Sequence, residues 1–388
     1  MDLDRNNSLK IRFGLSTLFA LLPGMYYIGN LIRMLGMSMA LYRIGGFVAG
    51  VIGILTLLFS NKNKYPTVYL FLAVYLFSLL IGWLVVGNIG FSSILSSLLL
   101  VGVSILMIQY PWGYRYGAFI FYLSASLMLF RIAGSPTRRV LTSSANYISI
   151  VMLLAVFFYY IPLERGKRKL RLISLLPSVI SFLISVWAGG RGGILCTIFL
   201  MVTICTLYVV SLSQKKPVRI ASIFIVVLLI GIILWMKNYN LVNAFMSLGK
   251  WKLRGTDNTA RLIIWKSYID KVKESVIYFL FGAPLDSIWL VKHYEGNLHN
   301  SFLQLHAYNG MFGFLVIIVM IWRAARYYFY NKKNITLILM IVIIIRGMTD
   351  KFIFGQYGMP VLLYFILVPC FENQQVSNEE NSILGKVV

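Results

Sequence analysis

Three polar side chains stand beside long apolar segments, at positions where charged groups often have a function. Arg191 lies between two glycine pairs, in Ala-Gly-Gly-Arg-Gly-Gly. Arg261 opens an amphipathic segment, and His299, followed by Asn300, directly precedes a return to apolar sequence. A guanidinium suits phosphate oxygens, and a single histidine can accept or orient the proton of a hydroxyl. These residues predict a site that binds an anionic ligand and acts on a hydroxyl.

Each of these residues also has a structural interpretation. Arg191 could reach lipid headgroups beside a flexible turn, Arg261 could be an ordinary solvated side chain, and His299 could be a solvated residue at a helix start. Arg346 and Asp350 are spaced i, i+4, which predicts an ion pair facing the bundle. Arg346 could instead add positive charge to the same site.

No metal or cofactor is predicted. The chain has three histidines, His293, His299 and His306. The last two are seven residues apart, about two helical turns, and do not readily chelate one ion. The sequence contains no His-x-x-x-His motif and no pair of cysteines at ligand spacing. We expect His306 to be packed or hydrogen-bonded inside a helix bundle.

The surrounding elements have the composition of membrane spans. The chain has 388 residues, of which 59% are hydrophobic and 12% charged, about half the charged share of a soluble protein. Apolar residues come in blocks of about 20, the length that crosses ~30 Å of hydrocarbon. The predicted fold is therefore all-α, a polytopic integral membrane protein with about twelve transmembrane helices. The predicted spans are 14–32, 37–59, 66–86, 90–109, 114–132, 144–162, 170–188, 193–212, 217–236, 300–321, 335–354 and 358–371.

The distribution of Lys and Arg predicts the orientation. With the N-terminus inside, the cytoplasmic segments hold more Lys and Arg than the short outer loops. The net charge of +24 then reflects topology, and no nucleic acid is expected as a partner. Both termini are predicted to be cytoplasmic. The domains are 1–236 with nine spans, an outer loop at 237–299, 300–371 with three spans, and a polar tail at 372–388 predicted to be disordered.

The outer loop contains a predicted amphipathic helix, which would lie on the membrane surface or pack on the bundle. Its N-cap would come from Asp257, Asn258 or Thr259. The loop carries nine basic and five acidic residues, which favours either an anionic ligand or anionic lipid headgroups. Arg254 is a further candidate for binding such a ligand. The predicted apolar stripe recurs at spacings of three and four: Leu262, Trp265, Ile269, Val272 and Val276.

Three local patterns, mainly within residues 185–355, resemble the O-antigen polymerase and O-antigen ligase superfamily of bacterial surface polysaccharide assembly. They are Gly190-Arg191-Gly192, Thr259-Ala260-Arg261 with Trp265, and Leu298-His299-Asn300-Ser301-Phe302-Leu303 with Gly310 and Gly313. The resemblance implies a metal-independent membrane glycosyltransferase at the periplasmic face of the inner membrane, whose donor is a glycan on undecaprenyl pyrophosphate. Arg191 and Arg261 would hold the pyrophosphate, and His299 would act at the acceptor hydroxyl. Asn300, Arg254 and Arg346 are further candidate substrate-binding residues.

Three functions remain open from the sequence. We favour a polymerase that joins repeat units of O-antigen or capsule, because such enzymes are numerous and divergent. A ligase that transfers the glycan to lipid A-core would use the same donor chemistry. A lipid-linked oligosaccharide flippase or other transporter would need no histidine where a loop re-enters the membrane. Expected partners are the lipid-linked glycan and membrane lipids, and a chain-length regulator protein is a candidate.

Overall fold

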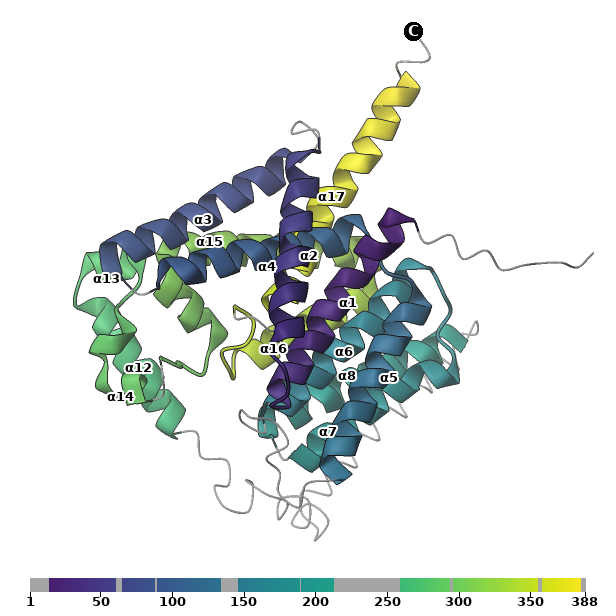
Figure 1. Ribbon diagram of the computed structural model, residues 1–388, viewed down its shortest axis with the longest axis horizontal. Coiled ribbons are helices and arrows are strands. Elements are labelled where there is room, and N and C mark those ends of the chain that lie inside the picture. The colour runs from purple at the N-terminus through teal and green to yellow at the C-terminus, as the bar shows by residue number, and fades with distance from the viewer. Residues whose placement is uncertain are drawn as a thin grey trace, which may run out of the picture.

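The computed structural model describes residues 14–60, 65–87, 89–133, 146–188, 190–212, 259–293, 296–354 and 358–384, shown in Figure 1. Within these ranges every regular element is a helix. Eight of the described helices are long and apolar enough to cross a membrane. The predicted all-α, multi-pass architecture is confirmed, whereas the count of about twelve spans is not.

Helices α1 to α6 and α8 follow the predicted spans to within a few residues, because a block of about 20 apolar residues fixes both the position and the length of a span. Helix α7 begins six residues after the predicted start at 170. The ninth predicted span, 217–236, lies outside the described residues. The bounds are α1 Leu15–Met34, α2 Ala40–Leu58, α3 Pro66–Val86, α4 Phe91–Gln109, α5 Tyr114–Ala133, α6 Asn146–Arg165, the 3₁₀ turn η2 Leu172–Leu175, α7 Leu176–Ala188 and α8 Arg191–Leu212.

The second half begins with short helices and returns to long ones. Its elements are α12 Thr259–Lys273, α13 Val276–Phe281, η4 Leu285–Ser287, α14 Trp289–His293, α15 Ser301–Tyr330, α16 Asn334–Gly347 and α17 Met359–Leu384. The helix α16 ends seven residues before the predicted span boundary at 354. The helix α17 continues to Leu384, through most of the tail that composition predicts to be disordered.

Helix α2 is continuous, although it contains Arg43 and several glycines. Its glycines serve close packing against α4. A Cβ atom built on Gly53 would lie 1.8 Å from the carbonyl oxygen of Gly102, and one on Gly50 would lie 2.7 Å from that of Leu99. Small residues let helix backbones approach in a membrane. The spacing of these glycines therefore marks the contact of α2 with α4.

Helix α6 forms the centre of the bundle. It packs against α5, α7, α8 and α16, and most of its side chains are buried. The outer-loop helices α12, α13 and α14 lie at the other side of the molecule, with α13 against α3 and α15 (Figure 1). They have their own small core, whose buried members are Ile264, Tyr268, Ala283, Leu285, Ile288, Val291, Leu298 and Ala307.

The predicted apolar stripe of the amphipathic helix packs only in part: Trp265 and Val272 lie against this small core. Leu262, Ile269 and Val276 are exposed, and the buried face of α12 is centred on Ile264 and Tyr268. The helix also ends at Lys273, and Val276 begins a second helix, α13. Two faces of this segment satisfy the helical spacing, and the face that carries Tyr268 is buried, with the Tyr268 hydroxyl bonded to His306 of α15.

Candidate functional site

His299 lies in a tight turn immediately before α15. Its backbone has φ +49°, in the left-handed region that only a few per cent of non-glycine residues adopt. Its N–H donates to Asn297 Oδ1 at 2.8 Å. Asn300 caps the helix: its Oδ1 accepts hydrogen bonds from the N–H groups of Phe302 and Leu303 at 2.9 and 3.1 Å. The turn therefore holds the imidazole, which is 24% exposed, at the end of a long helix.

The residue before the histidine is held from both sides. The N–H of Leu298 donates to Gln304 Oε1 at 3.1 Å, and its carbonyl accepts from Trp265 Nε1 at 2.8 Å. Trp265 belongs to α12, so this bond joins two of the three sequence patterns. Arg261 lies one helical turn before Trp265 and shares its face of α12. The contact therefore brings the half-buried Arg261 to the side of α12 that meets the histidine turn.

A buried carboxylate links His299 to an arginine. Asp350 Oδ1 lies 3.9 Å from His299 Nδ1, and Asp350 Oδ2 lies 3.5 Å from Arg346 Nη2. The side chains of Asp350 and Arg346 are each 3% exposed. The predicted ion pair between these two residues is confirmed. Ser301 fixes the loop that carries Asp350, because its hydroxyl donates to the Asp350 carbonyl at 2.6 Å.

The electrostatics of this arrangement keep Asp350 ionised. Burial by itself raises the pKa of the Asp350 carboxyl, but the neighbouring His299 imidazole and the charge of Arg346 outweigh burial and bring its pKa below the ordinary value of 3.8. A carboxylate that faces an imidazole nitrogen stabilises the protonated imidazole. Asp350 therefore lies between the His299 imidazole and the Arg346 guanidinium, and it neutralises the charge of Arg346.

Arg346 also connects this cluster to the start of α8. Its Nη1 donates to Thr349 Oγ1 at 2.8 Å, and its Nη2 donates to the carbonyl oxygen of Asn146 at 3.1 Å. A Cβ on Gly192 would lie 3.0 Å from the same Thr349 oxygen. The first turn of α8, which begins at Arg191, thus lies against the arginine that pairs with Asp350. Glycine at 192 permits this approach.

The structure brings most of the predicted site residues to one end of the bundle. His299 and Arg346 flank Asp350, and Asn300 follows His299 in the same turn. Helix α8 begins beside Arg346, and α12 contacts the turn. The side chain of Arg191 and all of Arg254 lie outside the described residues. Nothing in the structure tests the substrate roles predicted for these residues. Asn300 is occupied as a helix cap on its oxygen side.

Sequence reasoning missed Asp350 as the neighbour of His299. The two residues are 51 positions apart, and spacing revealed only the local partner Arg346. A signal was nevertheless present, because acidic residues are scarce within the apolar segments. A carboxylate in such a segment is costly unless it is paired, and often marks a site.

His306 has a structural role, as predicted. Its Nε2 lies 2.9 Å from the Phe279 carbonyl oxygen, which can only accept, so Nε2 carries the proton. Its Nδ1 therefore accepts from the Tyr268 hydroxyl at 2.7 Å. The neutral imidazole joins α12 and α13 to α15. Within the described residues no three His, Cys, Asp or Glu side chains lie close enough together to hold a metal ion.

Residues 176–318 match a family model described as O-antigen ligase. The match begins at α7 and ends within α15, and it includes Arg191, Arg261 and His299. Arg346 and Asp350 lie beyond its end. No curated protein matches the chain.

Proposed function

We propose that the chain, a member of the O-antigen polymerase and ligase superfamily, is a polymerase of polysaccharide repeat units. It would transfer a growing glycan from undecaprenyl pyrophosphate to a hydroxyl of the next lipid-linked unit, at the periplasmic face of the inner membrane. The observation that carries the proposal is the position of His299, which faces a buried carboxylate where two helices begin beside arginines.

In the proposed step the acceptor oxygen forms the new glycosidic bond as the bond from the donor sugar to pyrophosphate breaks. The electron pair of that bond leaves with undecaprenyl pyrophosphate, whose negative charge grows. Arg191 and Arg261 would stabilise this charge. Loss of one such electrostatic contact typically costs about 10²–10³ in rate.

The acceptor proton would pass to His299. General base catalysis of this kind contributes about 10²–10⁴ in rate. Asp350 would stabilise the resulting imidazolium through the contact at 3.9 Å. Because Asp350 also neutralises Arg346, the geometry favours a positioning role for Arg346 over direct contact with the pyrophosphate.

A ligase that transfers the glycan to lipid A-core is the second candidate. The description of the matching family favours it, and it would use the same donor, leaving group and histidine. The two enzymes differ only in the acceptor. A flippase would account less well for a histidine–carboxylate pair next to two helix starts, because transport of the lipid-linked glycan requires no base.

The test is a strain that lacks the gene, complemented with wild type, His299→Ala or the control His293→Ala. His293 lies exposed on α14, against Trp289, and has no part in the proposed step. Surface glycans are separated on a gel, and protein in the membrane is measured by blot. The proposal predicts core with a single repeat unit in the deletion strain, restored ladders with His293→Ala, and none with His299→Ala.

Other patterns would contradict parts of the proposal. Core without any repeat, together with accumulated lipid-linked polymer, would identify the ligase. Full ladders in the deletion strain would exclude both enzymes. Full restoration by His299→Ala would show that the histidine is structural.

A further inference from the structure

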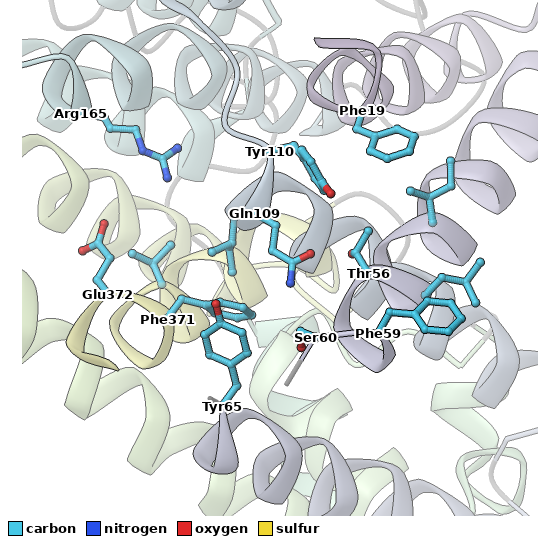
Figure 2. A pocket seen from close by; sticks show the side chains of 14 residues that line it. Phe19, Thr56, Phe59, Ser60, Tyr65, Gln109, Tyr110, Arg165, Phe371 and Glu372 are labelled. Carbon is cyan, nitrogen blue, oxygen red and sulfur yellow. The ribbon is translucent and has the colours of Figure 1, made fainter. Parts of the chain in front are cut away.

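A second site lies at the opposite end of the bundle from His299. It is a pocket of about 800 Å³, shown in Figure 2. Helix α6 runs from one site to the other. Asn146 at its start contacts Arg346, and Arg165 at its end lines the pocket. At 1.5 Å per residue, this helix of 20 residues separates them by about 30 Å. The pocket is therefore distinct from the proposed catalytic site.

Most of the residues that line the pocket are apolar or aromatic. Phe19 of α1, Phe59 after α2 and Ile108 of α4 line it, together with Tyr65 and Phe371, whose ring centroids lie 4.4 Å apart. Polar groups from Thr56, Ser60 and Gln109 interrupt these walls (Figure 2). Apolar walls with a few polar groups, in a volume between about 300 and 1,000 Å³, are typical of sites for small molecules. This lining fits an amphiphile.

The charged residues at the rim indicate that the headgroup of the amphiphile is negatively charged. Arg165 and Glu372 both line the pocket, and in Figure 2 they lie on the same side of it. The Glu372 carboxylate is bound by Lys333 and by the Tyr327 hydroxyl, so its charge is already balanced. Among the described residues, no carboxylate lies within ion-pair distance of the exposed Arg165.

The segment that follows Arg165 extends the positive rim. Lys167, Arg168, Lys169 and Arg171 are all exposed, and Arg168 stacks on the Tyr114 ring at 4.9 Å. Basic pockets between transmembrane helices on the cytoplasmic side bind acidic lipid headgroups. The loop charges predict that this end of the bundle is cytoplasmic.

We propose that the pocket binds an anionic phospholipid. Its phosphate would lie at Arg165, and the upper part of its acyl chains would lie along Phe19, Phe59 and Phe371. The ligand would come from the membrane leaflet opposite the one that presents the lipid-linked glycan. Binding of this lipid requires no turnover and does not depend on the proposed reaction.

The test measures lipid binding to the purified full chain by native mass spectrometry after delipidation in detergent. Phosphatidylglycerol is titrated against wild type, Arg165→Gln and the control Lys169→Gln. Lys169 is exposed in the same segment and does not line the pocket. We expect saturable binding that Arg165→Gln weakens about fivefold, the contribution of one basic side chain at an anionic lipid surface. Lys169→Gln should bind as wild type does.

A second variant, Ser60→Trp, fills the pocket without changing the charge and should also weaken binding. Phosphatidylcholine and inorganic phosphate are the comparison ligands. Equal binding of phosphatidylcholine would overturn the proposal, as would equal losses in Arg165→Gln and Lys169→Gln, which would indicate general surface attraction. Saturation by inorganic phosphate that displaces the lipid would assign the site to free phosphate instead. If Arg165→Gln does not fold, Ser60→Trp decides, and wild-type affinity in that variant would overturn the proposal.

Discussion

Replacing Asp350 by Asn removes the charge that both His299 and Arg346 face, with almost no change in shape. In the native protein the Asp350 and Arg346 side chains are each 3% exposed and their charged atoms lie 3.5 Å apart. The substitution leaves a guanidinium buried without its counter-ion. Arg346 keeps its bonds to Thr349 and to the Asn146 carbonyl, but these partners are neutral.

Two estimates of the free energy lost when this ion pair is broken agree. At 3.5 Å and an effective dielectric constant of about 20, the attraction between the two charges is about 5 kcal/mol. Removal of one partner from a buried pair typically costs about 3–5 kcal/mol. The pair contributes its full stability at neutral pH, because the pKa of Asp350 is lowered below 3.8 in the folded state. That contribution is present above pH 3.8 and is lost as the pH falls through the lower folded-state value.

The assay is a double-mutant cycle at neutral pH. Asp350→Asn, Arg346→Met and the double variant are unfolded in mixed detergent micelles, and the free energies of unfolding are compared with wild type. We expect each single variant to lose about 3–5 kcal/mol, and the double variant to lose much less than the sum, because it leaves no unpaired charge. Additive losses, or a stable Asp350→Asn, would refute this account of the pair.

The same variants distinguish the role of Asp350 beside His299 from its role beside Arg346. The double variant should be folded yet should not restore the glycan ladder, because His299 still lacks its carboxylate. A restored ladder would mean that Asp350 serves Arg346 alone and that the contact of 3.9 Å with His299 has no part in the reaction.

Three further predictions concern contacts between the helices that hold the site. Trp265→Phe removes the bond to the Leu298 carbonyl and should cost about 1 kcal/mol and reduce the glycan ladder at equal membrane expression; an unchanged ladder would show that this bond does not position the histidine turn. Gly310→Ala places a Cβ 2.1 Å from the Leu280 carbonyl oxygen. The Gly310 backbone has φ +61° and ψ −168°, so the substitution should lower the free energy of unfolding by at least ~1–3 kcal/mol from the backbone alone. Normal yield and stability in detergent would contradict this. Glu164→Gln weakens the carboxylate cap on the first turn of α16 and should cost about 1 kcal/mol in the micelle assay, whereas an unchanged free energy of unfolding would mean that the amide caps equally well.

The positions of the spans were predictable because length and apolar composition determine them. Helix α3 spans Pro66–Val86, the predicted 66–86. The end of α16 was not predictable from composition. The sequence stays largely apolar to 354, yet the helix ends at Gly347, and the following loop turns so that the Ser301 hydroxyl binds the Asp350 carbonyl and the Phe352 and Ile353 N–H groups. That ending depends on a contact 49 residues away along the chain.

The sequence predicts candidate residues for the site but not the contacts that join them. Motif spacing identified His299 and Arg261, and i, i+4 spacing identified the pair of Arg346 with Asp350. The link from that pair to His299, and the bond from Trp265 to Leu298, join segments whose separation no local period encodes. The apolar stripe was right only in part for the same reason, because two faces of α12 fit a helical period and tertiary contacts determine which one is buried.

Two helices that carry an arginine in the first turn begin near this end of the bundle. Asp350 neutralises Arg346, and two further arginines, Arg191 and Arg261, stand in the first turns of α8 and α12. Neither first turn contains an acidic side chain. A cation at a helix N-terminus opposes the helix dipole and is unfavourable for that helix, whereas an anion there is favourable. Both helix starts therefore lack the negative charge that a bound pyrophosphate would supply, and in the proposed reaction that charge is greatest as the glycosidic bond breaks.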